Sequence, residues 1–265
     1  MKKNRIKHNL EVVSFIVVTA IIMLACGSSP DPTATLGPVI DQPVVKPTEQ
    51  VQVPTNTTQP IELPTEEETV DNSEEYPAWF TEEWDSDALG WYTVVEKNGD
   101  TGNINDVDIY TDGGKLNFEL SKWLIAYTFY EPYIYKDVRI DAEVENRGAN
   151  TNNVLLVCRS SDEGLYLVNV ANSGLYSMYA YEAASDSYYR IADGGSKLIK
   201  TGKEINTYTL ICEGKTLTLG INGEEVRSYT DNKYVFREGE VGIGVASEDI
   251  MPVKLEFEYV TISVP

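Results

Sequence analysis

Three carboxylates alternate along one short segment of the chain, "DAEVEN", in which single apolar residues separate Asp141, Glu143 and Glu145. Hydrolysis of a glycosidic bond needs two carboxyl groups about 5 to 9.5 Å apart. Alternate residues of a β-strand share one face and supply such a spacing. The alternative is a solvated strand face on which Arg139 balances part of the charge, because exposed faces of antiparallel sheets are commonly polar. The segment "KLEFEYV" repeats the pattern, which favours the solvated face.

A second group of oxygen-bearing side chains lies in the segment "KNGDTGNINDVD". Hard cations such as Ca²⁺ prefer carboxylate and amide oxygens. The candidate calcium ligands are Asp100, Asn103 and Asp106, with Asn105 and Asp108 beside them. The spacing does not fit an EF-hand loop, and ordinary turns require the same Asn, Asp and Gly residues. The expectation is therefore a domain without a cofactor, with Ca²⁺ as the one candidate.

The segment Gly174–Arg190 is rich in tyrosine, the side chain that stacks its ring face on the apolar face of a sugar. Strand alternation places Tyr176 and Met178 toward the core and Tyr179 and Tyr181 on the outer face. Nearby polar groups would hydrogen-bond the sugar hydroxyls. The predicted ligand-binding residues are Tyr179, Tyr181, Tyr189 and Arg190. The alternative is plain packing, because strands favour aromatic residues.

Two further aromatic groups compete with this assignment. The segment "KWLIAYTFYEPYIYKD" supplies rings that could also face a ligand: Trp123, Tyr127, Tyr130, Tyr133 and Tyr135. Nearer the start of the domain, Trp79, Trp84 and Trp91 are expected to pack around the entry of the chain.

Histidine and cysteine usage limits the possible chemistry. The only histidine is His8, near the N-terminus, so an exported chain without that segment has neither a Ser-His-Asp triad nor histidine-ligated zinc. Cys158 and Cys212 are both in phase with inward-facing residues. They are either two buried thiols or one disulfide closing a loop of about 55 residues, which would stabilise the fold by roughly 4 kcal/mol.

The first 25 residues have the order of a secretory signal: a basic start, an apolar run from Val12 to Leu24, and small residues around Cys26. The ending "MLACG" resembles the bacterial lipoprotein signal, in which the cysteine thiol is lipidated and becomes the new N-terminus. The alternative is an uncleaved anchor helix, although ~13 apolar residues are few for a span. Either way, the prediction is a bacterial protein attached to the cell membrane and facing outside.

The charge of the remaining chain is strongly acidic. Residues 1–25 hold four of the 21 basic and one of the 42 acidic residues, which leaves 17 against 41 and a net charge of −24. Nucleic acid is therefore not an expected partner, because phosphate binding requires a basic surface.

The composition changes sharply at Tyr76. Residues 26–75 contain eight of the 12 prolines and no aromatic residue, which predicts a disordered stalk. Residues 76–265 form a segment large enough for one core. Period-2 runs bounded by Gly, Asn and Asp clusters recur through it: Lys115–Leu120, Val138–Val144, Val154–Cys158, Leu165–Val170, Leu175–Tyr181, Tyr208–Cys212, Leu217–Ile221, Val241–Ala246 and Val253–Ile262. This pattern predicts an all-β antiparallel sandwich.

The segment "YTLICEGKTLTLGINGEEV", Tyr208–Val226, resembles the late hairpin of concanavalin A-like jelly-roll domains, in particular those of bacterial surface lipoproteins and of three-keto-disaccharide hydrolase-like and laminin G-like relatives. Other landmarks agree: "WFTEEWDSDALGW", "VLLVCRSSDEGLYLVNVANSGLYSMY", "GEVGIGVAS" and "VKLEFEYVTI". The resemblance spans nearly all of Trp79–Ile262. It implies two curved sheets with carbohydrate contacts on the concave face, and it places Cys158 and Cys212 close together.

The resemblance covers lectins and glycoside hydrolases alike. Laminarinase-type relatives carry Glu, Asp and Glu on one strand in another order than this chain does. We therefore expect a lipid-anchored glycan-binding module without catalysis. The alternatives are a glycoside hydrolase of the three-keto-disaccharide type that uses Asp141, Glu143 and Glu145, or a structural domain without a small ligand.

Overall fold

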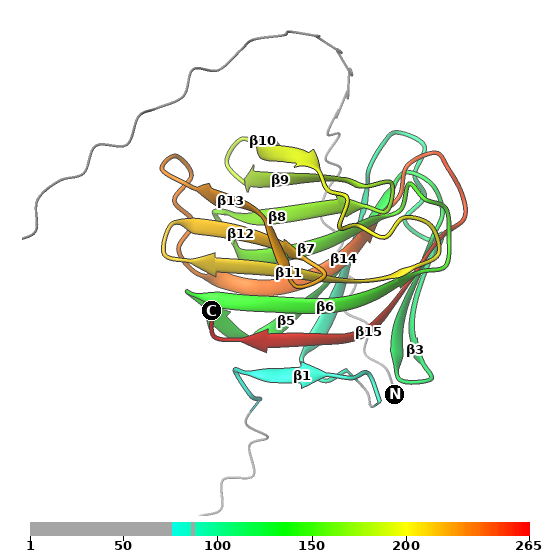
Figure 1. The fold of residues 1–265 in the computed structure, drawn as a ribbon, viewed down its shortest axis with the longest axis horizontal. Helices are drawn as coiled ribbons and strands as arrows, with labels where there is room; N and C mark the ends of the chain where they lie inside the picture. The colour runs from blue at the N-terminus through cyan, green and yellow to red at the C-terminus, as the bar shows by residue number, and fades with distance from the viewer. Residues whose placement is uncertain (1–75, 86–87) are drawn as a thin grey trace, which may run out of the picture. The chain divides into compact units, whose positions relative to one another are not determined.

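The computed structural model describes residues 76–85 and 88–265, and these form a sandwich of two antiparallel β-sheets without a helix (Figure 1). The predicted fold class is confirmed. The signal, Cys26 and the stalk lie outside the described residues. Among the described residues, none belongs to a helix long and apolar enough to cross a membrane.

Sheet A has eight strands, in the order β13-β12-β11-β6-β15-β4-β3, with β1 paired to β15. Their bounds in chain order are β1 Phe80–Glu82, β3 Val107–Asp112, β4 Lys115–Leu120, β6 Val138–Asn146, β11 Ile205–Glu213, β12 Thr216–Ile221, β13 Glu224–Thr230 and β15 Val253–Ser263.

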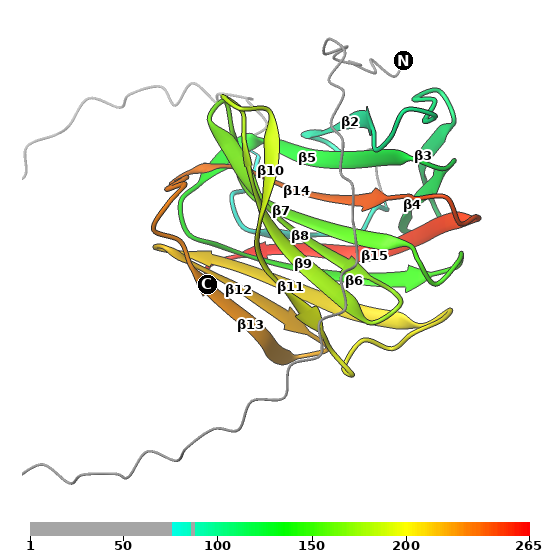
Figure 2. The same ribbon diagram turned by 90° about the horizontal axis from the view of Figure 1, so that it is seen from above.

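Sheet B has seven strands, in the order β10-β9-β8-β7-β14-β5-β2. Their bounds are β2 Trp91–Lys97, β5 Leu124–Tyr135, β7 Asn153–Ser161, β8 Gly164–Ala171, β9 Leu175–Glu182, β10 Ser187–Gly195 and β14 Gly239–Ala246. Sheet B twists strongly, so that β9 and β10 cross the direction of β5 and β14 (Figure 2).

The main core lies between the two sheets and is built by strand alternation. On β6, Val138, Ile140, Ala142 and Val144 point into the sandwich and are fully or almost fully buried. From the opposite layer, alternate residues of sheet B also point into the sandwich, among them Met178. Alternation of this kind is what allows two sheets to pack face to face.

A disulfide joins the two layers within this core. Cys158 of β7 and Cys212 of β11 are bonded, with their Cα atoms 6.7 Å apart, and neither is exposed. The link therefore connects sheet B directly to sheet A.

Candidate functional site

A second hydrophobic cluster lies on the outer face of sheet B, away from the main core. Its members face outward by alternation, yet each is at most 9 % exposed: Tyr127, Phe129, Leu155, Val157, Leu165, Leu167 and Ala246. An outward-facing side chain in the middle of a sheet is buried only if something covers it. Sheet B must therefore curl over its own outer face, which makes this face concave.

The cover is the β9–β10 hairpin. Tyr188 of β10 brings its hydroxyl within 3.4 Å of the hydroxyl of Tyr127 on β5, although four strands separate β10 from β5 in the sheet. The Tyr188 ring packs against Tyr181, with 4.7 Å between ring centroids, and meets Tyr179 edge-on at 6.4 Å. We call the contact between Tyr127 and Tyr188 the tyrosine bridge.

Two glycines of β14 make room for the rings beneath this cover. A Cβ atom at Gly242 would lie 2.6 Å from Cδ1 of Phe129, and one at Gly244 would lie 3.0 Å from Cδ1 of Tyr127. A side chain at Gly242 would therefore collide with the ring of the neighbouring strand. The glycines allow the aromatic rings of β5 to lie flat over β14.

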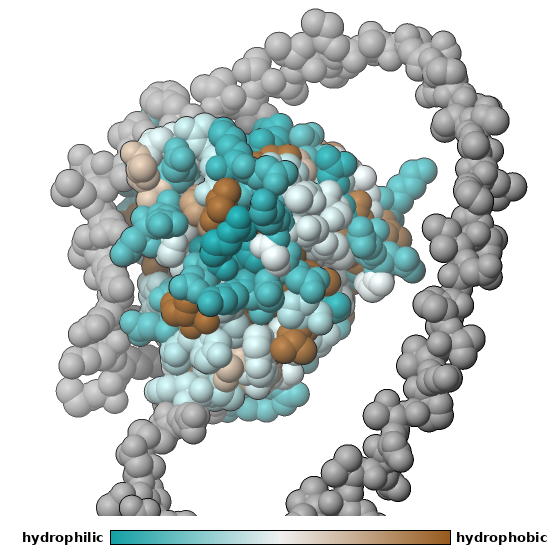
Figure 3. Space-filling view, turned by 90° about the vertical axis from the view of Figure 1, so that its left-hand side faces the viewer, coloured by the Kyte–Doolittle hydropathy of each residue, from teal (hydrophilic) through white to brown (hydrophobic). Residues whose placement is uncertain are grey.

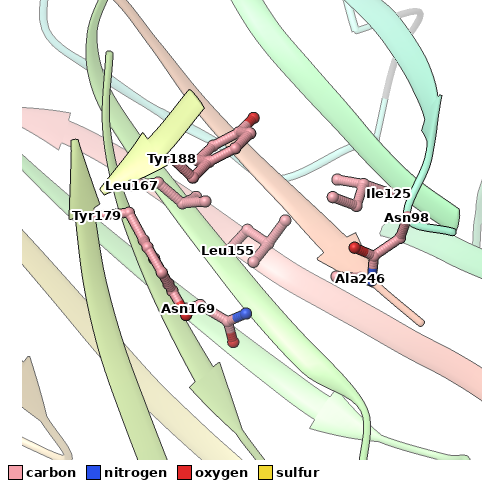
Figure 4. Close-up of a pocket in the computed structure, with 8 residues that line it drawn as sticks. All are labelled: Asn98, Ile125, Leu155, Leu167, Asn169, Tyr179, Tyr188 and Ala246. Carbon is pink, nitrogen blue, oxygen red and sulfur yellow. The ribbon is translucent and has the colours of Figure 1, made fainter. Parts of the chain in front are cut away.

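Beside the tyrosine bridge, the concave face opens into a small pocket that is partly open to solvent (Figure 4). Eight residues line it: Asn98, Ile125, Leu155, Leu167, Asn169, Tyr179, Tyr188 and Ala246. Asn98 donates a hydrogen bond from Nδ2 to the carbonyl oxygen of Ser247 at 3.0 Å, which fixes its amide so that Oδ1 points toward the pocket. The ring of Tyr179 extends alongside Asn169 on the opposite wall (Figure 4). The pocket combines an apolar floor with a few oriented polar groups, as ligand sites commonly do.

Two carboxylates stand near the rim of the pocket. Glu96 of β2 is paired in register with Ile125, and Asp186 in the β9–β10 turn accepts a hydrogen bond from the Tyr181 hydroxyl at 2.8 Å. Although part of the Glu96 side chain is exposed, desolvation by the surrounding protein raises the pKa of its carboxyl group, and the charge of Asp186 adds to this. Burial and the Asp186 carboxylate raise the pKa of Tyr181 to about 12. The rim is therefore acidic.

The structure brings together three of the four predicted ligand-binding residues. Tyr179 lines the pocket, Tyr181 supports Tyr188, and the Arg190 guanidinium lies 6.0 Å from the ring centre of Tyr179. Tyr176 faces the core, as alternation predicts.

The fourth predicted residue, Tyr189, is not part of this site. It is paired with Ala180, whose side chain faces the core, so its ring points to the opposite side of β10 from Tyr188. There it stacks on Tyr234 at 5.5 Å, and the Lys233 ammonium lies 4.9 Å from its ring centre. The prediction that Tyr189 joins Tyr179 is therefore wrong, because adjacent residues of a strand face opposite ways.

Sequence reasoning missed Tyr188 and most of the pocket floor. Tyr188 could have been found by extending the alternation through the turn, since Tyr188 and Tyr181 are directly paired across the hairpin. Asn98 and Asn169 carried no signal that separated them from other loop and strand asparagines.

The three alternating carboxylates of β6 lie on the outer face of sheet A. Arg139 binds Asp141 with two nitrogens at 2.6 and 2.8 Å, and the Thr209 hydroxyl donates to the same carboxylate at 2.6 Å. Glu145 pairs with Arg147 at 3.1 Å. Asp141 and Glu145 are therefore held in ion pairs, on a different sheet from the pocket.

Two of the predicted calcium ligands, Asn103 and Asp106, belong to a turn network. Asn103 donates from Nδ2 to Asp106 at 3.0 Å, and its Oδ1 accepts the backbone N–H of Asn105 at 3.2 Å. Within residues 76–85 and 88–265, no group of three or more His, Cys, Asp or Glu side chains is placed to hold a metal ion.

The competing aromatic residues are divided between packing and the concave face. Tyr130 and Tyr135 donate to the carbonyl oxygens of Pro77 and Ala78, at 2.9 and 2.7 Å. Tyr127 belongs to the tyrosine bridge. The tryptophans of the chain entry pack on this group: Trp84 lies 5.5 Å from Trp91, and Trp79 lies 5.3 Å from Tyr135, between ring centroids.

Comparison with solved structures identifies the fold. No protein-family model matches the sequence, and no curated protein matches it. Among solved structures, the chain is similar to the carbohydrate-binding module CBM66 from Bacillus subtilis, with a TM-score of 0.50 and 16 % identity over 66 % of this chain and 95 % of that one. It is also similar to a β-1,3-glucanase from Mycobacterium marinum, with a TM-score of 0.52 and 10 % identity over 72 % of this chain and 100 % of that one.

A third similar structure is a Bacillus subtilis protein of unknown function with a galectin-like fold, with a TM-score of 0.52 and 10 % identity over 70 % of this chain and 94 % of that one. Identities this low establish a shared fold and not a shared activity. The described residues of this chain form a concanavalin A-like jelly roll, the fold of lectin and glucanase domains.

Proposed function

We propose that this protein is a glycan-binding module and that the pocket on the concave face of sheet B is its ligand site. The observation that carries the proposal is the composition of that pocket. The rings of Tyr179 and Tyr188 offer apolar faces for a sugar ring, and the amides of Asn98 and Asn169 offer hydrogen bonds to its hydroxyls. The fold is one that carbohydrate-binding modules use.

The proposal includes a place for the protein in the cell. The lipoprotein-like ending at Cys26 and the proline-rich segment that follows support a domain held outside a bacterial membrane on a stalk. Two or three acyl chains on one cysteine anchor a protein stably.

A hydrolytic activity is the second candidate, because two carboxylates stand near the rim of the pocket. Glu96, whose pKa is raised by desolvation, would be the proton donor, and Asp186 its partner. The β6 carboxylates support this candidate less well, because Asp141 is already bound by Arg139.

A glycan array with the purified protein tests the proposal. We expect Tyr179→Ala to weaken binding of the array hits by about tenfold or more, since losing a central aromatic contact costs upward of about 1.4 kcal/mol. The matched control is Tyr189→Ala, which removes the same side chain from the same hairpin on the face away from the pocket. Equal loss in both variants, or in neither, would contradict the assignment of the site.

The same samples separate binding from hydrolysis. A non-catalytic module releases no reducing sugar from the glycans that it binds. Release that is lost in Glu96→Gln would establish the second candidate at the rim. Release that survives in Glu96→Gln and is lost in Asp141→Asn or Glu143→Gln would instead assign hydrolysis to the carboxylates of β6.

A further inference from the structure

We propose that the pocket receives the end of a glycan chain and not an internal stretch, because the tyrosine bridge closes the concave face beside it. This inference rests on the proposed function and names the part of the glycan that is recognised. An open trough lets a linear chain enter on one side and leave on the other. A glycan chain bound in this pocket would be blocked on one side by the ring of Tyr188. That ring contacts Tyr127 across the concave face.

The concave face beyond the bridge is already filled by the protein itself. Tyr127 is 2 % exposed, Phe129 5 % and Val157 not at all, although all three point away from the main core. A sugar residue can stack only on an aromatic ring that solvent can reach. These buried side chains therefore cannot form further subsites where they lie.

The cover is anchored at several points, so it is part of the folded sheet. The backbone N–H of Ala183, in the β9–β10 turn, donates to the carbonyl oxygen of Glu163 at 3.0 Å. Tyr181 binds Asp186 of the same turn and packs on Tyr188. Moving Tyr188 away from Tyr127 would break these contacts and expose a buried aromatic cluster to water.

The polarity of the pocket fits a terminal residue. A terminal sugar carries one free hydroxyl that an internal sugar uses in its glycosidic bond. The amides of Asn98 and Asn169 are placed to recognise such a hydroxyl, and a missing partner would leave these polar groups unpaired.

Binding stoichiometry tests the inference. The probes are linear glucans, galactans and fructans, each as a hexasaccharide and as a long polymer, titrated into the full-length protein by calorimetry. For every probe that binds, we expect one protein per chain end and the same affinity per end at both lengths. Several proteins bound along one polymer chain, or an affinity that rises with the number of internal residues, would overturn the inference and leave the proposed function standing. No binding to any probe would contradict the proposed function together with the inference.

A variant that removes the bridge gives the second measurement. Tyr127→Ala removes the β5 side of the bridge and leaves both rings of the pocket, Tyr179 and Tyr188, in place. It should uncover the face beyond the pocket, so that the number of proteins bound per polymer chain rises from one per end to several. Tyr189→Ala, which leaves the bridge intact, should keep the stoichiometry of the wild type. A thermal unfolding curve establishes whether Tyr127→Ala is folded, and if it is not, the stoichiometry of the wild-type protein decides the inference. A folded Tyr127→Ala protein that still binds only chain ends would show that the bridge does not close the face.

Discussion

At the scale of single residues, Asp231 is a buried carboxylate, directly after β13, that accepts four hydrogen bonds. Its carboxylate accepts the Tyr166 hydroxyl at 2.6 Å and the backbone N–H groups of Lys233, Tyr234 and Val235 at 2.9, 3.2 and 2.6 Å. Burial acts to raise the pKa of Asp231, but these hydrogen bonds outweigh it and hold the pKa below the ordinary 3.8. Asp231 therefore fixes the turn that carries Tyr234, the residue on which Tyr189 stacks.

We expect Asp231→Asn to lower the free energy of unfolding by about 1.5 to 3 kcal/mol at pH 7, because an amide cannot accept hydrogen bonds at both of its terminal atoms. The folded pKa is depressed, so this stability is fully present above the unfolded pKa of about 3.9 and is lost as the pH falls through the lower folded pKa. Urea unfolding at pH 7 and below pH 4 measures both effects.

The control for this prediction is Asp162→Asn, which removes a charge from an exposed turn residue. It should leave stability within about 0.5 kcal/mol of the wild type. A difference between Asp231→Asn and the wild type that persists unchanged at a pH below the folded pKa of Asp231 would mean that the carboxylate charge is not its source.

At the scale of elements, the sandwich depends on a covalent link between its layers. The disulfide between β7 and β11 spans 54 residues of sequence and lies within the core. Closing a long loop restricts the unfolded chain, which stabilises the folded one. The link also fixes β7, whose outer face carries Leu155 on the pocket floor, relative to sheet A.

The prediction for the disulfide concerns both its presence and its effect on stability. With Cys26 replaced by alanine, thiol titration of the chain denatured without reductant should find no free cysteine, and two reactive thiols would refute the bond. Replacing Cys158 and Cys212 by alanine should lower the free energy of unfolding by about 2 to 5 kcal/mol. The reduced Cys26→Ala chain, which keeps both thiols, is the control, and it should show a similar loss.

The strands that the sequence predicted and those that it missed differ in burial. All nine period-2 runs are strands, including those in β7, β8 and β14, which are buried on both faces over most of their length. β5 was missed because Leu124–Tyr130 is buried on both faces apart from Ile125, which erases the alternation. β13 was missed for the opposite reason, since this edge strand is largely exposed on both faces. Alternation therefore identified a strand wherever the sequence showed it, and its absence did not exclude a strand.

At the scale of the whole molecule, the net charge and the proposed lipid anchor bear on where the domain acts. The chain carries a net charge of −21, and the described surface seen in Figure 3 is mostly hydrophilic, with hydrophobic residues in small separate patches. Such a surface favours solubility at high local concentration. It supports the proposal that a stalk and a lipid anchor attach the domain to the membrane and that its own surface does not.

The anchor is tested by following the lipid itself. Cells fed a labelled fatty acid should incorporate the label into the wild-type protein and not into Cys26→Ala, because the lipid is expected on that thiol. Cys158→Ala is the matched control and should keep the label. An unlabelled wild-type protein that retains residues 1–25 would instead support the uncleaved anchor helix.

The sequence by itself determined the local structure of this protein. Period-2 alternation defined nine of the strands and the two-layer class, and it separated Tyr176, in the core, from Tyr179 and Tyr181, on the outer face. These features follow from backbone geometry, in which each residue faces opposite to its neighbours.

Only the tertiary structure decided which outward-facing residues form a site. The twist of sheet B brings Tyr188 of one edge onto Tyr127, four strands away from β10, and encloses a pocket with Asn98 from a loop. Twist accumulates over many strands and depends on packing at glycines such as Gly242. No single segment carries that information, so the pocket could not be read from any one strand.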